Sequence, residues 1–174
     1  MKSITAAKEI ALLSMMTALL IGGQLALSMI MGVEVVTVLL CSFSCVFGIK
    51  RSMIVATAFS LLRCFIFGFF PSVILLYLFY YNLFAFVFGL LGKTKLGKYP
   101  FVIIFAVLLT ISFTLIDDII TPSMYKVQFL PYFYASLSVM LIQSINAAIT
   151  VGLLFLPLYK IFEKINGIKL ECKP

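Results

Sequence analysis

Charged side chains are so scarce in this chain, and apolar runs so long, that most of it has to be buried in an apolar solvent. The 174 residues are 64% hydrophobic and 11% charged, whereas a soluble domain carries about 25% charged residues. A chain of this size has too few polar side chains to cover the surface of a soluble core. The composition therefore excludes an ordinary soluble globular protein and predicts an integral membrane protein.

Six apolar runs are candidates for membrane-spanning helices, each of which needs roughly 20 mainly apolar residues. Gly, Pro or charged residues bound the runs, of which the second is short and the sixth is long: approximately 9–31, 35–47, 52–70, 71–91, 101–116 and 131–162. No internal repeat, low-complexity tract or soluble linker is visible between them. We therefore predict an all-α, single-domain bundle of six transmembrane helices over residues 1–174.

Basic residues predict the orientation of these spans, because Lys and Arg in short loops stay on the cytoplasmic side of a membrane. With the six runs crossing in alternate directions, all basic residues except Arg63 and Lys126 fall on one side. We therefore expect both termini in the cytoplasm and a multi-pass location in the cell membrane. The net charge of +7 then reflects topology, and the sequence predicts no nucleic-acid partner.

The residue types that most enzymatic and metal chemistry requires are missing or isolated. The chain has no His, and it contains no P-loop and no Ser–His–Asp arrangement. Cys41 and Cys45 share a helix face, but without His they are interpreted as packing residues rather than metal ligands. The sequence therefore predicts no metal, no cofactor and no enzymatic activity, and a chain that cannot power transport by itself.

Polar residues within the apolar runs gather toward the predicted outer side, although a bilayer penalises each of them. Glu34 lies at the turn into the second run, and Arg63 lies just beyond the midplane of the third. Asp117 and Asp118 are expected to end the fifth run, before a loop over residues 119–130. Their clustering on one side of the membrane is the main indication of a binding site.

Helical spacing brings further polar groups to the same region. Gln143, Asn146 and Thr150 fall at positions i, i+3 and i+7 of the sixth run, which makes one polar stripe. Tyr77 and Tyr81 are four residues apart in the outer half of the fourth run. We predict a polar cavity, open to the outside and walled by aromatic rings, that binds a small, partly aromatic or heterocyclic solute. The predicted substrate-binding residues are Glu34, Arg63, Tyr77, Tyr81, Asn82, Asp117, Gln143 and Asn146.

These groups also have an interpretation that involves no ligand. Arg63 would form a structural ion pair with Glu34 or with an aspartate and so orient helices. Tyr132 and Tyr134 would anchor the chain at the membrane interface, and the polar stripe of the sixth run would join helices by hydrogen bonds. If Arg63 binds the solute instead, it suits a solute with an anionic or strongly hydrogen-bond-accepting group.

Small residues mark one face of the first run. Ser14, Ala18, Gly22 and Ala26 recur every four residues, and Ala7 with Ala11 repeats the spacing nearer the amino terminus. Small residues at this spacing let another helix approach closely in lipid, where helix association depends on packing. This pattern indicates a docking face, either for the protein's own helices or for a partner.

Two patches of sequence carry a resemblance to a known family. Residues 32–37 (Gly-Val-Glu-Val-Val-Thr) lead to Val-Phe-Gly at 46–48 and to Lys50, and this segment is similar to a family pattern written P-N-[IV]-E-[LI]-V-[ST]…V-F-G, with Met-Gly here in place of Pro-Asn. Residues 153–160 (Leu-Leu-Phe-Leu-Pro-Leu-Tyr-Lys) are similar to the end of that family's final helix. With its size, its six predicted spans and its small-residue first helix, the chain resembles the membrane-embedded substrate-binding S components of energy-coupling factor (ECF) vitamin transporters.

The resemblance implies a mechanism and a set of partners. In this family a vitamin or related micronutrient binds from the outside and a loop closes over it. The S component then topples within the membrane against a transmembrane T component that is driven by two cytoplasmic ATPase subunits. The resemblance places the contact with the T component at Ala7, Ala11, Ser14 and Ala18. It places the solute site at Glu34, Arg63, Tyr81, Asn82, Asp117, Gln143 and Asn146.

A stand-alone secondary transporter is the alternative function. In that case Glu34, Asp117 or Asp118 would couple the movement of a proton or cation to the movement of a small solute. No inverted repeat and no pair of broken helices is visible in the sequence, and such features are typical of many secondary transporters. The S-component hypothesis is therefore preferred.

Overall fold

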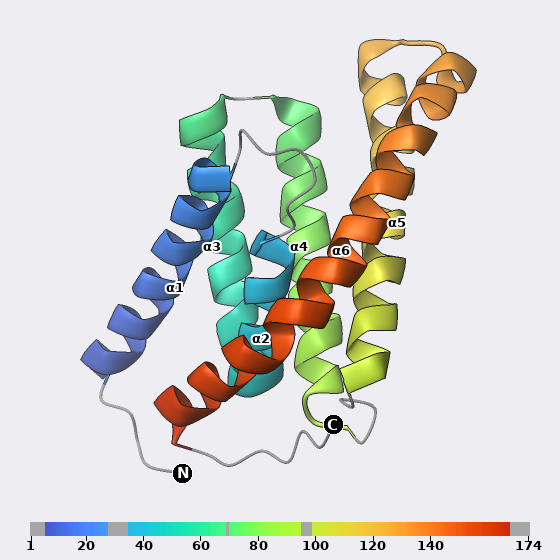
Figure 1. The fold of residues 1–174 in the computed structure, drawn as a ribbon. Coiled ribbons are helices and arrows are strands. Elements are labelled where there is room, and N and C mark those ends of the chain that lie inside the picture. The colour runs from blue at the N-terminus through green and yellow to red at the C-terminus, as the bar shows by residue number, and fades with distance from the viewer. Residues whose placement is uncertain (1–5, 28–34, 69, 95–98, 168–174) are drawn as a thin grey trace.

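The computed structural model describes residues 6–27, 35–68, 70–94 and 99–167, which form six α-helices (Figure 1). Four of them, α1, α4, α5 and α6, are long and apolar enough to cross a membrane, and α2 is a shorter apolar helix. The all-α, multi-pass prediction is confirmed at this level. In chain order the helices are α1 (Ala6–Leu27), α2 (Val35–Phe47), α3 (Ile49–Phe67), α4 (Pro71–Leu91), α5 (Tyr99–Tyr125) and α6 (Phe129–Asn166).

Successive helices run in opposite directions, so that the chain turns back at each end of the bundle (Figure 1). One end collects the start of α1, the α2–α3 turn at Gly48, the end of α4, the start of α5 and the end of α6. We call it the basic end, because it carries Lys8, Lys50, Arg51, Lys93, Lys160 and Lys164. At the opposite end, α5 and α6 project beyond α3 and α4 (Figure 1).

Helix α2 forms the centre of the bundle. Every residue from Val36 to Phe47 is buried, and α2 packs against α1, α3, α4 and α6. The sequence permits this burial because α2 contains no charged residue, and because its Ser42 hydroxyl donates a hydrogen bond to the carbonyl of Val38, 2.7 Å away. At 1.5 Å per residue, its 13 residues extend only about 20 Å, two thirds of a hydrocarbon core of about 30 Å.

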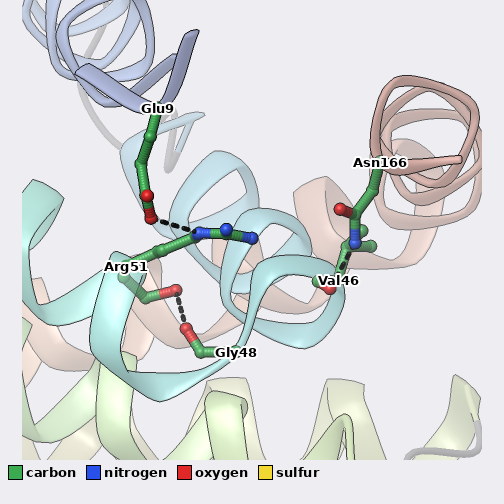
Figure 2. Close-up of polar contacts among 6 residues, drawn as sticks. Glu9, Val46, Gly48, Arg51 and Asn166 are labelled. Atoms are coloured by element: carbon green, nitrogen blue, oxygen red, sulfur yellow. Dashed lines mark hydrogen bonds and ion pairs between the residues drawn. The ribbon is translucent and has the colours of Figure 1, made fainter. Parts of the chain in front are cut away.

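Polar contacts at the basic end join three helices around α2 (Figure 2). Arg51 of α3 pairs with Glu9 of α1 at 2.9 Å, and the side-chain amide of Asn166 at the end of α6 donates to the carbonyl of Val46, 3.1 Å away. These contacts fix α1 and α6 against the α2–α3 turn.

The predicted end of the fifth run is wrong. Helix α5 continues through Asp117 and Asp118 to Tyr125, so that most of the loop expected at 119–130 is helical and α6 already begins at Phe129. The two carboxylates find hydrogen-bond donors on α5 and α6. Because they do not need water at a helix end, they do not terminate the helix.

Close approach of backbones explains one glycine of α4. A Cβ atom added to Gly89 would lie 2.9 Å from the Cα and the nitrogen of Ile49, at the start of α3. A Cβ added to Gly22, in the middle of α1, would meet nothing within 4 Å. The α3–α4 pair can therefore pack only with glycine at position 89.

We expect Gly89→Ala to destabilise the bundle by about 1–3 kcal/mol, because the added methyl group forces backbone shifts in a packed interface. Gly22→Ala is the matched control: it brings the same gain in helix propensity, about 0.5–1 kcal/mol, without a clash. Thermal unfolding in detergent measures both. Equal melting temperatures for the two variants would contradict the packing described here.

Candidate solute-binding site

The guanidinium of Arg63 is held by aromatic rings. Its Cζ atom lies 3.8 Å from the centroid of the Tyr77 ring on α4 and 5.0 Å from that of Phe67, one turn further along α3. Cation–π contacts of this kind are stronger when the groups are shielded from water. The Nε atom of Arg63 is buried and has no hydrogen-bond partner.

Aromatic rings continue from Arg63 across α4 to α5. Tyr77 contacts Tyr81 at a centroid distance of 5.2 Å and Phe113 of α5 at 5.7 Å, and Tyr80 contacts Phe113 at 4.6 Å. The Phe59 ring of α3 meets Tyr81 edge-on at 5.1 Å. We call these five rings the aromatic wall: Phe59, Tyr77, Tyr80, Tyr81 and Phe113.

Arg63, Tyr77 and Phe113 lie just beyond the end of the central helix, whereas Phe59, Tyr80 and Tyr81 belong to the core that surrounds it. Arg63 and Phe113 each lie 14 residues along their helix from the basic end, and Tyr77 lies 14 residues before Leu91 at that end. This corresponds to about 21 Å at 1.5 Å per residue, whereas α2 extends only about 20 Å. The short central helix therefore leaves the space between α3, α4 and α5 free of α2 at the level of these side chains.

A polar pocket of about 260 Å³ lies between α5 and α6 and continues this region. Phe113 belongs to both the aromatic wall and the pocket, which also contains a carboxylate, a phenol, an amide and two hydroxyls. We call it the acid pocket, and its lining residues are Phe113, Thr114, Asp117, Tyr132, Ala135, Ser136, Val139 and Gln143.

Hydroxyl groups, not basic side chains, are the hydrogen-bond partners of the two aspartates. The carboxylate of Asp117 accepts from the hydroxyl of Thr121 at 2.7 Å and from that of Tyr132 at 3.0 Å. Asp118 is 2% exposed. Its Oδ2 accepts from the Ser136 hydroxyl at 2.8 Å, and its Oδ1 is buried without a partner. Asp117 thus lines the acid pocket, and Asp118 is bonded to Ser136 in the pocket lining. The hydrogen-bond donors found for both carboxylates are neutral hydroxyls.

The structure brings part of the predicted set together. Arg63, Tyr77 and Tyr81 meet at the aromatic wall, and Asp117 and Gln143 line the acid pocket. The Oε1 of Gln143 lies 3.5 Å from the hydroxyl of Thr114, at the limit of a hydrogen bond.

Two other predicted residues, Asn82 and Asn146, lie elsewhere. Asn82 accepts a hydrogen bond from Thr57 at 3.0 Å and donates to the carbonyl of Leu78, so it joins α4 to α3 beside a separate apolar hollow. Asn146 is partly buried and does not line the acid pocket. Glu34 falls outside the described residues.

Phe113, Thr114 and Ser136 also belong to the site, although the sequence analysis did not select them. Phe113 and Thr114 lie four and three residues before Asp117, so they lie on the same helix face as the carboxylate. Tyr132 was interpreted as a possible interface anchor, and the structure instead places its hydroxyl on Asp117. The pairing of α5 with α6 makes these contacts, and helical spacing within one run does not reveal it.

The small residues of α1 line a second, apolar hollow. This groove of about 670 Å³ lies between α1 and α3, and its walls include Ser14, Ala18 and Gly22 of α1 and Ala58 of α3. Ala7 and Ala11 are exposed on α1 nearer the basic end. The predicted small-residue face is therefore not filled by the protein's own described helices.

We expect Ser136→Ala to destabilise the protein by about 1–3 kcal/mol, because it leaves both oxygens of a buried carboxylate without a donor. Ser138→Ala, two residues away at an exposed position of α6, is the matched control and should have little effect. Thermal unfolding in detergent compares them. If the two variants melt together, the Ser136–Asp118 hydrogen bond contributes nothing to stability.

Comparison of the chain with protein-family models, with curated proteins and with solved structures gave no match in any of the three searches.

Proposed function

We propose that the chain is the substrate-capture subunit, or S component, of an ECF-type ABC importer. It binds a vitamin or related micronutrient from the extracellular side of the membrane and delivers it through a T component and two cytoplasmic ATPase subunits. In this proposal the six helices form a transmembrane bundle in which the central α2 extends over about two thirds of the hydrocarbon core. The basic end faces the cytoplasm, as expected for short loops rich in Lys and Arg. The aromatic wall and the acid pocket then lie in the outer half of the bundle.

The observation that carries this proposal is the position of the polar groups relative to α2. Arg63 and the Tyr77 and Phe113 rings of the aromatic wall lie at the level where the central helix stops, and the acid pocket adjoins them through Phe113. Such a region combines rings that stack on a planar solute with a few polar groups that orient it. A small solute entering from the outer side would meet these groups before it meets the packed core around α2.

The groove between α1 and α3 supports the second half of the proposal. Its small residues leave room for another helix to approach closely, and the residues that line it are mainly apolar. The chain contains no nucleotide-binding motif, so accumulation of a solute against a gradient requires a partner that hydrolyses ATP. We assign the groove to the T component on the strength of the sequence resemblance.

Co-expression with an ECF T component and its two ATPases tests this function. We expect a four-subunit complex by native mass spectrometry, and we expect Ala18→Leu to reduce its yield at least tenfold because the larger side chain fills the groove. Ser138→Leu places the same side chain on an exposed face of α6 and should leave assembly unchanged. A protein that emerges alone from cells containing an assembled T component and ATPases would contradict the proposal.

A stand-alone secondary transporter remains the second candidate, because Asp118 is buried with one oxygen unpartnered. A carboxylate of this kind is a plausible carrier of a proton or cation. This function predicts uptake that stops when an ionophore collapses the ion gradient and that needs no ATPase. The S-component function predicts the reverse on both counts.

A further inference from the structure

We propose that the solute carries an anionic group, a carboxylate or a phosphate, and that the edge of the Arg63 guanidinium binds it. This inference rests on one part of the proposed function, namely that the region beyond α2 binds a solute. It names the chemical class of that solute. Arg63 contacts aromatic rings, lies on the face of α3 that continues the core, and has no acidic partner among the described residues.

Within the described part of the chain, aromatic rings rather than hydrogen-bond acceptors contact the guanidinium of Arg63. Tyr77 and Phe67 both lie within 5.0 Å of the Arg63 Cζ atom. The five N–H groups of a guanidinium point outward in its plane and match the geometry of a carboxylate or phosphate. Among the described residues, none accepts a hydrogen bond from Arg63, and its Nε is buried.

The direction of Arg63 favours a ligand inside the bundle. Arg63 lies one turn beyond Phe59 on the same face of α3, and Phe59 is fully buried against Tyr81 of α4. Tyr77 lies one turn from Tyr81 on α4, and its ring contacts the guanidinium of Arg63. The Arg63–Tyr77 pair is therefore stacked above a core pair and continues the interior of the bundle beyond α2.

No described acidic residue neutralises Arg63. The ion pair found within the described part of the chain joins Arg51 to Glu9 at the basic end. Asp117 and Asp118 take their hydrogen bonds from hydroxyls of α5 and α6. Arg63 is partly buried, and a buried charged donor without an acceptor, such as its Nε, carries a desolvation cost that an anionic ligand would offset. The structural ion pair between Arg63 and an aspartate, which the sequence analysis considered, is thus not formed.

Charge-matched aromatic probes test this assignment on the purified protein in a neutral detergent. Benzoate, benzamide and benzamidine share one ring and differ in charge. At equal ionic strength we expect benzoate to raise the melting temperature in a concentration-dependent manner, and the neutral and cationic probes to have no such effect. Phenyl phosphate in place of benzoate then shows which anion the site prefers. Absence of an effect of both benzoate and phenyl phosphate, or a larger effect of benzamidine, would overturn the proposal.

Two arginines on the same helix give a matched pair of variants. Arg63→Gln should weaken apparent benzoate affinity at least tenfold, whereas Arg51→Gln, twelve residues away at the basic end, should leave the benzoate-induced shift in place. Each shift is measured against the variant's own melting temperature. Should Arg63→Gln not fold, Arg63→Lys replaces it: it keeps the charge but loses the planar fork, and we expect several-fold weaker binding. Unchanged affinity in the Arg63 variant that folds would refute the assignment.

An anionic lipid headgroup is the competing source of the same chemistry. Added phosphatidylglycerol that raises the melting temperature through Arg63 and blocks the benzoate effect would show that the arginine holds lipid, which overturns the proposal. Phosphatidylcholine is the control lipid. The outcome is independent of assembly: failure to form a complex with a T component would refute the proposed function while leaving the benzoate result intact.

Discussion

Burial of the short helix α2 is the feature on which the rest of the bundle depends. Four helices pack against it, and they can bury their apolar faces there because α2 contains no charged residue. Its length has an equally important effect. Since α2 ends about two thirds of the way across a hydrocarbon core, the four longer helices continue past it. The polar groups of Arg63, Tyr77 and Asp117 lie in that region.

The two ends of the bundle are stabilised by different contacts. This difference is consistent with a structural role for the basic end and a binding role for the opposite end. At the basic end, side-chain contacts such as Arg51–Glu9 and Asn166–Val46 tie separate helices to the α2–α3 turn. At the opposite end, the described contacts are ring stacking and hydroxyl–carboxylate hydrogen bonds, with Arg63 and Asp118 each retaining a buried atom without a partner. Unsatisfied groups of this kind cost stability, and in a membrane they commonly mark a pathway or a site.

Most of the helix pattern could be predicted from the sequence. The second and fourth runs were expected at 35–47 and 71–91, the bounds that the structure gives, because Gly and Pro mark their ends. The predicted end of the fifth run was too early, because two adjacent aspartates, Asp117 and Asp118, suggest a helix end that is exposed to water. Donors from a different helix, at Tyr132 and Ser136, keep them inside, and a single run of sequence does not reveal such tertiary contacts.

The candidate site could be predicted where the spacing of residues within one helix determines which side chains share a face. Tyr77 and Tyr81 are one turn apart and do share a face. Asn82 follows Tyr81 directly, so it points about 100° away at 3.6 residues per turn, toward Thr57. The contact between Arg63 and Tyr77 joins two helices and needed the structure.

Accessibility of the acid pocket from the outer side tests the central claim most directly. With the four native cysteines replaced, Val139→Cys places a thiol in the pocket lining, and Lys93→Cys places one at the basic end. The account predicts that a membrane-impermeant thiol reagent added to intact cells labels the cysteine at 139, and labels that at 93 only after permeabilisation. Labelling of 93 from outside, with 139 reached only after permeabilisation, would contradict it.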